Sequence, residues 1–202
     1  NFSNYELSLL DALKQDSLIL LIGEAGIGKS YELKKLYDTY VESNIYYPIF
    51  ISIRDNTLES IYEKIKKYGN YSNSKKALYI FDGLDEVEPE SRNEFVKLIR
   101  TNFTKTNDKT AIISTRENFA IEISDFKKYR LQEISDTDIK NYIIENGVSI
   151  DDFDDMLNEL NCQSILKIPF YLSSLINAFL HKKINFTQDN IMDFLISSRI
   201  SN

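Results

Sequence analysis

The stretch Gly23-Glu24-Ala25-Gly26-Ile27-Gly28-Lys29-Ser30 decides which fold this sequence predicts. It follows the apolar run 18–22 and precedes a helical pattern of apolar residues that begins near Tyr31. Three of the six glycines in the chain fall within these eight residues. Glycines let the backbone curl so that successive N–H groups point at one anion, a path that Cβ atoms would obstruct. We therefore expect a phosphate-binding loop between a strand and a helix.

The last two residues of this loop carry groups that can bind a nucleoside triphosphate and its Mg²⁺. Lys29 can reach the β- and γ-phosphates, and the Ser30 hydroxyl can bind Mg²⁺. The helix that follows would point its positive N-terminus at the anion. The alternative is a glycine-rich turn between a strand and a helix, with a lysine that binds no ligand. We expect the nucleotide to contact these loop residues: Gly23, Glu24, Ala25, Gly26, Ile27, Gly28, Lys29 and Ser30.

A second motif, Phe81-Asp82-Gly83-Leu84-Asp85-Glu86, supplies carboxylates. It follows Ala77-Leu78-Tyr79-Ile80, which is typical of a buried strand. Carboxylates at a strand end can hold a Mg²⁺ shell and polarise water. The alternative is a solvated acidic turn before Pro89.

Predicted strands alternate with predicted helices through the first two thirds of the chain. The strands are expected over 18–22, 45–53, 77–81, 110–115 and 129–131. Several are apolar on both faces, as strands of a parallel sheet covered by helices are. Pro48 favours an edge position for 45–53. The sequence therefore predicts an α/β fold, with a parallel sheet sandwiched between helices.

After Gln132 the pattern becomes helical throughout. Ser135 and Asp138 fit a capping box, and further helices are expected over 139–145, 153–160, 169–180 and 190–200. We therefore expect two domains: a nucleotide-binding domain over 1–133 and a small all-helical domain over 134–202.

The amino-acid composition argues against some classes of binding partner. The net charge of −7 argues against an extended nucleic-acid-binding face, and no apolar run is long enough to cross a membrane. The single Cys162 excludes an internal disulfide, which favours a reducing, cytoplasmic setting.

Together these motifs resemble the NACHT family, within the signal-transduction ATPases with numerous domains (STAND). The glycine-rich loop is similar to the family's Walker A motif, and residues 81–86 are similar to its extended Walker B motif. Four other stretches also resemble the family: the second strand at 50–54, the sensor strand at 112–116 that ends in Arg116, the entry to the helical domain at 129–134, and a proline motif at 168–172. The resemblance implies a P-loop NTPase core.

The resemblance also implies roles for single residues. Lys29 would bind the β- and γ-phosphates. Mg²⁺ would be held by Ser30 and Asp82. Asp85 and Glu86 would position and polarise the attacking water, Arg116 would sense the γ-phosphate, and Pro169 would pack beside the nucleotide base.

Some of these side chains could instead have purely structural roles. Arg116 could pair with Glu117 or another acid, and Pro169 could be a first-turn helix proline. Arg54 is more typical of a structural ion pair than of a ligand.

For the whole protein, the resemblance implies a nucleotide switch that binds ATP and ADP with Mg²⁺. It would hydrolyse ATP slowly and control self-association of a larger signalling protein, in innate immune or antiphage defence. Two alternatives remain: a scaffold that binds nucleotide without hydrolysing it, and a small-molecule kinase.

Overall fold

The computed structural model describes residues 8–43, 45–69, 76–103, 109–122, 125–160 and 163–180, together with Asp193 and Ser197. Backbone packing divides the chain into two units. The sheet unit comprises residues 1–25 and 29–131, and the helical unit comprises residues 26–28 and 132–202.

The sheet unit is built on five strands in the order β2-β3-β4-β1-β5, and every neighbouring pair is parallel. This confirms the predicted α/β fold with a parallel sheet, and β2 lies at an edge as Pro48 indicated. The strands are β1 (Leu18–Ile22), β2 (Tyr46–Ser52), β3 (Lys76–Asp82), β4 (Lys109–Thr115) and β5 (Lys127–Arg130).

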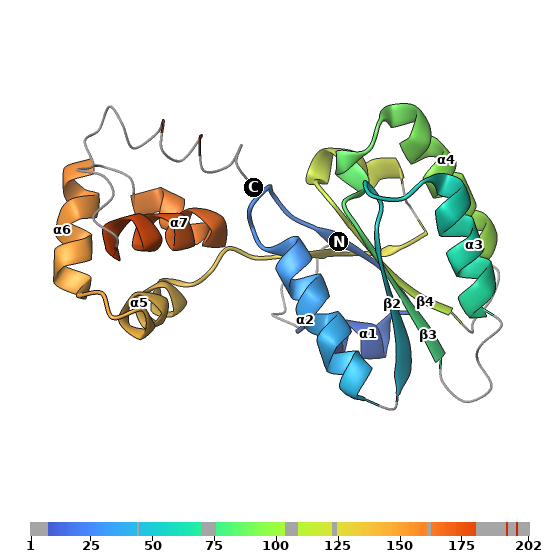
Figure 1. The fold of residues 1–202 in the computed structure, drawn as a ribbon, viewed down its shortest axis with the longest axis horizontal. Coiled ribbons are helices and arrows are strands. Elements are labelled where there is room, and N and C mark those ends of the chain that lie inside the picture. Colours follow the sequence, from blue (N-terminus) through green and yellow to red (C-terminus); the bar gives the residue numbers. More distant parts are fainter. Residues whose placement is uncertain are drawn as a thin grey trace. The chain divides into compact units, whose positions relative to one another are not determined.

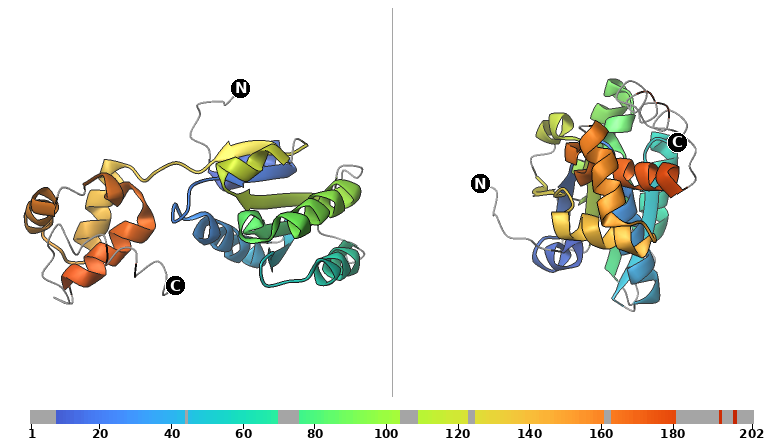
Figure 2. Two further views of the ribbon diagram at one scale, coloured as in Figure 1. Left: turned by 90° about the horizontal axis from the view of Figure 1, so that it is seen from above. Right: turned by 90° about the vertical axis from the view of Figure 1, so that its left-hand side faces the viewer.

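Helices cover both faces of the sheet (Figures 1 and 2). One face carries α1 (Leu9–Gln15) and α2 (Lys29–Glu42), and the other carries α3 (Leu58–Gly69) and α4 (Pro89–Phe103). Residues of β3 alternate between the two cores, because successive side chains of a strand point to opposite faces. Leu78 and Ile80 pack with α1 and α2, whereas Tyr79 and Phe81 pack with α3 and α4.

The carboxyl ends of β1, β3 and β4 meet at one edge of the sheet. β4 lies between the other two strands, with Ile22 opposite Thr115 on one side and Phe81 opposite Ile113 on the other. Because all three strands are parallel, the segments that follow them emerge at the same edge. In open α/β sheets this edge is where ligands bind.

The helical unit contains α5 (Asp136–Glu145), α6 (Ile150–Leu160) and α7 (Pro169–Leu180). The Ser135 hydroxyl accepts a hydrogen bond from the Asp138 N–H at 3.1 Å, which confirms the predicted cap. Phe153 and Leu175 are fully buried at the centre of this unit. The helix expected over 190–200 lies almost wholly outside the described residues.

In the part of the chain that the structure describes, we find no helix with the length and apolar character required to span a membrane.

Candidate nucleotide-binding site

The loop between β1 and α2 has the backbone conformation that its glycines permit. Gly26 and Gly28 have φ angles of 84° and 100°, in a region that residues with a side chain rarely adopt. Helix α2 begins at Lys29, two residues before the apolar pattern indicated. Lys29 and Ser30 therefore stand in the first turn, where the N–H groups have no partners within the helix and favour an anion.

The Lys29 amine is folded onto the loop. Its Nζ donates hydrogen bonds to the carbonyl oxygens of Gly23, at 2.6 Å, and of Glu24, at 3.1 Å. The pKa of Lys29 lies below its ordinary value, chiefly because the amine is partly buried. The positive charge of Arg116 also lowers it, whereas the negative charges of Asp85, Asp82 and Glu24 oppose this shift. These charges act on one amine because the loop and the carboxyl ends of β3 and β4 lie close together.

The carboxylate of Asp82, the last residue of β3, is fixed by a side chain from β4. The Ser114 hydroxyl donates to Asp82 Oδ1 at 2.5 Å and accepts from the Gly83 N–H at 2.8 Å. Ser114 was not among the site residues expected from the sequence. The sequence feature that could have indicated Ser114 is a hydroxyl residue near the end of an apolar strand, two residues before Arg116, for which a role in the site was predicted.

Asp85 and Glu86 lie in a 3₁₀ turn, Leu84–Glu86, which we name the acidic turn. Gly83 enters it with a φ of 86°, and the Glu86 N–H donates to the Gly83 carbonyl at 3.0 Å. The two acids have different surroundings. The Asp85 side chain is only 4% exposed, whereas that of Glu86 is 45% exposed.

Each acid of this turn is paired with an arginine from a neighbouring strand end. Arg116 Nε lies 2.7 Å from Asp85 Oδ2, and an Arg54 terminal nitrogen lies 3.5 Å from Glu86 Oε2. Glu117, an alternative partner for Arg116, is paired with Arg130 instead. Arg116 therefore forms an ion pair with a site carboxylate, which is one of the two roles expected for this residue.

Ser30 and Asp82 are a chemically suitable pair for Mg²⁺, because hydroxyl and carboxylate oxygens are its usual protein ligands. Within the described ranges, no group of three or more His, Cys, Asp or Glu side chains is arranged to hold a metal. A Mg²⁺ ion bound through one or two protein oxygens takes its remaining ligands from phosphate and water, so it does not require such a group.

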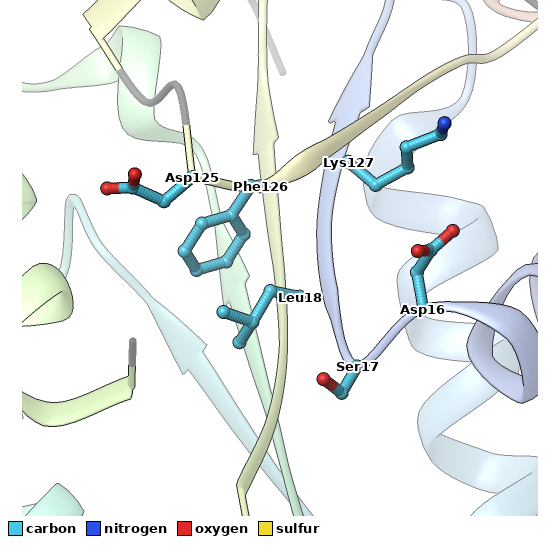
Figure 3. Close-up of a pocket in the computed structure, with 6 residues that line it drawn as sticks. All are labelled: Asp16, Ser17, Leu18, Asp125, Phe126 and Lys127. Atoms are coloured by element: carbon cyan, nitrogen blue, oxygen red, sulfur yellow. The ribbon is translucent and has the colours of Figure 1, made fainter. Parts of the chain in front are cut away.

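The structure thus brings Lys29, Asp82, the acidic turn and Arg116 to one edge of the sheet. Residues 26–28 of the phosphate loop are grouped with the helical unit, so their part in the site stays a prediction. Pro169 is the first residue of α7 in the helical unit, and its role beside a base stays a prediction. A depression of about 400 Å³ lies elsewhere, at the amino ends of β1 and β5 (Figure 3). It is lined in part by Asp16, Ser17 and Lys127, and it is separate from this site.

Comparison with protein-family models gives a match over residues 5–166, well over half of the chain, to the family described as novel STAND NTPase 3. Comparison with individual curated proteins gives no match. The match lies in the STAND class that the motifs predicted, and the narrower resemblance to the NACHT family stays a prediction. This chain belongs to the STAND class of nucleoside triphosphatases, as a member of the family novel STAND NTPase 3.

Proposed function

We propose that this chain is the ATP- and ADP-binding switch module of a larger signalling protein, and that it hydrolyses ATP slowly with Mg²⁺. The observation that carries the proposal is the convergence of Lys29, Asp82, the acidic turn and Arg116 at the carboxyl edge of the sheet. Phosphoryl transfer is catalysed mainly by positioning and by neutralising charge, and these residues supply both.

In this mechanism the phosphate loop and the N-terminus of α2 hold the phosphates, and Lys29 leaves the Gly23 and Glu24 carbonyls to bind them. Ser30 and Asp82 would hold Mg²⁺, which when bound neutralises phosphate charge. Glu86 is the better placed of the two acids to polarise a water, because Asp85 is buried against Arg116.

The Arg116–Asp85 ion pair supports a regulated switch. A γ-phosphate would compete with the Asp85 carboxylate for the Arg116 guanidinium, since both are anions with matching geometry. Arg116 would therefore pair with the γ-phosphate when ATP is bound and with Asp85 when ADP is bound. Slow turnover fits this role, because a switch requires a long-lived bound state.

Single-turnover hydrolysis of ATP by the wild-type chain and by Glu86→Gln tests the proposal. We expect the variant to keep its affinity for Mg·ATP within about threefold and to lose hydrolysis by about 100-fold or more, as loss of a catalytic base does. Glu88→Gln is the matched control, because it makes the same change at an exposed acid two residues away. We expect it to hydrolyse like the wild type.

The other two candidate functions give different results. A scaffold binds ATP but shows no hydrolysis that Glu86→Gln could remove. A small-molecule kinase forms a phosphorylated product in place of free phosphate. Either result contradicts the proposal.

For the whole protein we propose a cytoplasmic sensor that self-associates when ATP replaces ADP, in innate immune or antiphage defence. The motifs that resemble the NACHT family support this proposal, as do the net charge of −7 and the single cysteine. Its partners would be the nucleotide, further copies of the protein and effector domains outside these residues.

A further inference from the structure

Helix α4 carries an arginine on its buried side. Arg92 precedes Phe95, Val96 and Ile99 by three, four and seven residues, so it shares the stripe of the helix that faces the core. Its relative exposure is 7%. Arginine is almost never buried to this degree without partners that satisfy its charge and its N–H groups.

The partners of Arg92 are the backbone carbonyls on either side of the acidic pair. Nε donates to the Leu84 oxygen at 3.3 Å, and one terminal nitrogen donates to the Val87 oxygen at 2.8 Å. Leu84 directly precedes Asp85, and Val87 directly follows Glu86. One planar group therefore holds both ends of the segment that carries the two acids.

The guanidinium also contacts the segment that follows Arg116. Its central carbon lies 4.0 Å from the centroid of the Phe119 ring, in the 3₁₀ helix Glu117–Glu122. At this distance a cation is attracted to the face of the ring. The acidic turn and the segment after β4 are thus joined twice, once through Arg92 and Phe119 and once through Asp85 and Arg116.

The shape of the guanidinium explains why this position suits arginine. Its N–H groups form a rigid planar fork that can bond two acceptors while a flat face stacks on an aromatic ring. A lysine has one point charge on a flexible stem and cannot do all three. An apolar side chain would leave both carbonyls without this donor.

We propose that Arg92 is a positioning residue for nucleotide hydrolysis, which fixes the acidic turn against the segment that carries Arg116. This inference rests on the proposed ATPase function, since it assigns a purpose to the position of Asp85 and Glu86. Arg92 acts through the backbone carbonyls on either side of these acids and touches no reacting group.

The test compares Arg92→Met with Arg100→Met in the full chain. Methionine keeps much of the apolar stem of arginine and removes the fork. Arg100 lies on the same helix but is 47% exposed and pairs with Asp125 at 3.2 Å, so it controls for loss of an arginine from α4. The measurements are hydrogen exchange of the Glu86 amide without nucleotide, the Kd for Mg·ATP, and the single-turnover rate of hydrolysis.

We expect Arg92→Met to raise exchange of the Glu86 amide by about tenfold beyond any rise in the amides of β3, because the turn opens locally. Its Kd for Mg·ATP should stay within about threefold of the wild type, while hydrolysis falls by about tenfold or more. Arg100→Met should match the wild type in all three measurements. Equal losses in affinity and rate, or unchanged exchange at Glu86, would overturn the proposal.

Phe119→Leu gives a second variant that leaves the carbonyl hydrogen bonds in place. It should show the same pattern with smaller changes, and unchanged exchange and rate would contradict the role of the ring contact. Failure of the proposed function is a separate outcome, because the wild-type chain itself would then lack hydrolysis. The Glu86 amide still reports whether Arg92 holds the turn.

Discussion

Gly83 and Ser114 hold the first carboxylate of the site at the end of β3. Ser114 bonds both the Asp82 side chain and the Gly83 N–H, and Gly83 turns the chain into the acidic turn with a positive φ. A Cβ at Gly83 would lie 3.2 Å from Glu86 Oε2. A side chain at this position would therefore adopt an unfavourable φ and would also have to shift the Glu86 carboxylate by a few tenths of an ångström.

Gly83→Ala tests this local requirement. The unfavourable φ should lower the free energy of unfolding by about 1–2 kcal/mol, and the new methyl group should displace the Glu86 carboxylate and slow ATP hydrolysis. Denaturant unfolding and single-turnover kinetics measure the two effects.

Gly147→Ala is the matched control, because Gly147 has a φ of 73° and a methyl group added there would meet none of the described atoms within 4 Å. It should lose a similar free energy of unfolding and keep its rate of hydrolysis. Equal rates in both variants would show that the position of Glu86 does not depend on Gly83.

Ser114→Ala tests the support of Asp82. It removes the donor of a short hydrogen bond to a carboxylate, so we expect a loss of about 1.5–3 kcal/mol in the free energy of unfolding and a weaker affinity for Mg·ATP. Thr110→Val is the control on the same strand. The Thr110 hydroxyl is buried, and the described residues offer it no hydrogen-bond partner, so its removal should cost little. Equal losses in the two variants would contradict a specific role for Ser114.

At the scale of the elements, a buried hydroxyl ties α3 to β3. The Tyr79 hydroxyl donates to the Ile65 carbonyl at 3.1 Å, and its ring is fully buried beside Phe81 and Phe103. Burial raises the pKa of Tyr79 to about 12. An unfolded tyrosine loses its proton near a pH of about 10. Between about pH 10 and about 12, Tyr79 is therefore protonated in the folded chain and deprotonated in the unfolded chain.

Tyr79→Phe should therefore change how stability depends on pH. Between about pH 10 and about 12 the unfolded wild-type chain has lost a proton that the folded chain keeps, so the free energy of unfolding falls by up to about 1.4 kcal/mol per pH unit. The contribution is fully present below about pH 10. The variant should lose about 1 kcal/mol at neutral pH and fall less steeply above about pH 10. Parallel curves for the two proteins from urea unfolding would contradict this account.

The sequence predicts the helices with clear terminal signals well and those without such signals less well. α7 starts at Pro169, as its pattern indicated, because proline fits the first helical turn, and α4 likewise starts at a proline, Pro89. α2 starts earlier than its apolar pattern, because Lys29 and Ser30 belong to a helix whose first turn faces the loop instead of the core. The acidic turn has too few residues for a periodic pattern, so it was expected only as the end of a strand.

The contacts between distant segments could not be predicted in the same way. Lys29, Asp82 and Asp85 are predicted as site residues from motif chemistry, and Arg116 from the resemblance to the NACHT family. The pairing of Arg116 with Asp85, in contrast, depends on the order of β3, β4 and β1 in the sheet. Arg92 could have been noticed as a charge on an apolar stripe. Its partners, two carbonyls and a ring, follow only from the fold.

At the scale of the whole molecule, the sheet order explains why one site can be assembled from distant parts of the sequence. The loop after β1 and the acids after β3 are separated by more than fifty residues, yet only β4 lies between their strands. The function proposed for the chain depends on this edge being a nucleotide site. Its central claim is that Lys29 binds the phosphates.

Thermal unfolding of the chain with and without Mg·ATP tests that claim most directly, in the wild type, in Lys29→Ala and in Lys34→Ala. Lys34 is the matched control, an exposed lysine of α2 whose amine lies 3.7 Å from Asp38. At a nucleotide concentration of about 100 times Kd, the wild type and Lys34→Ala should gain about 5–10 °C in Tm. Lys29→Ala should gain little or nothing, and a gain in Lys29→Ala equal to that of the wild type would contradict the account.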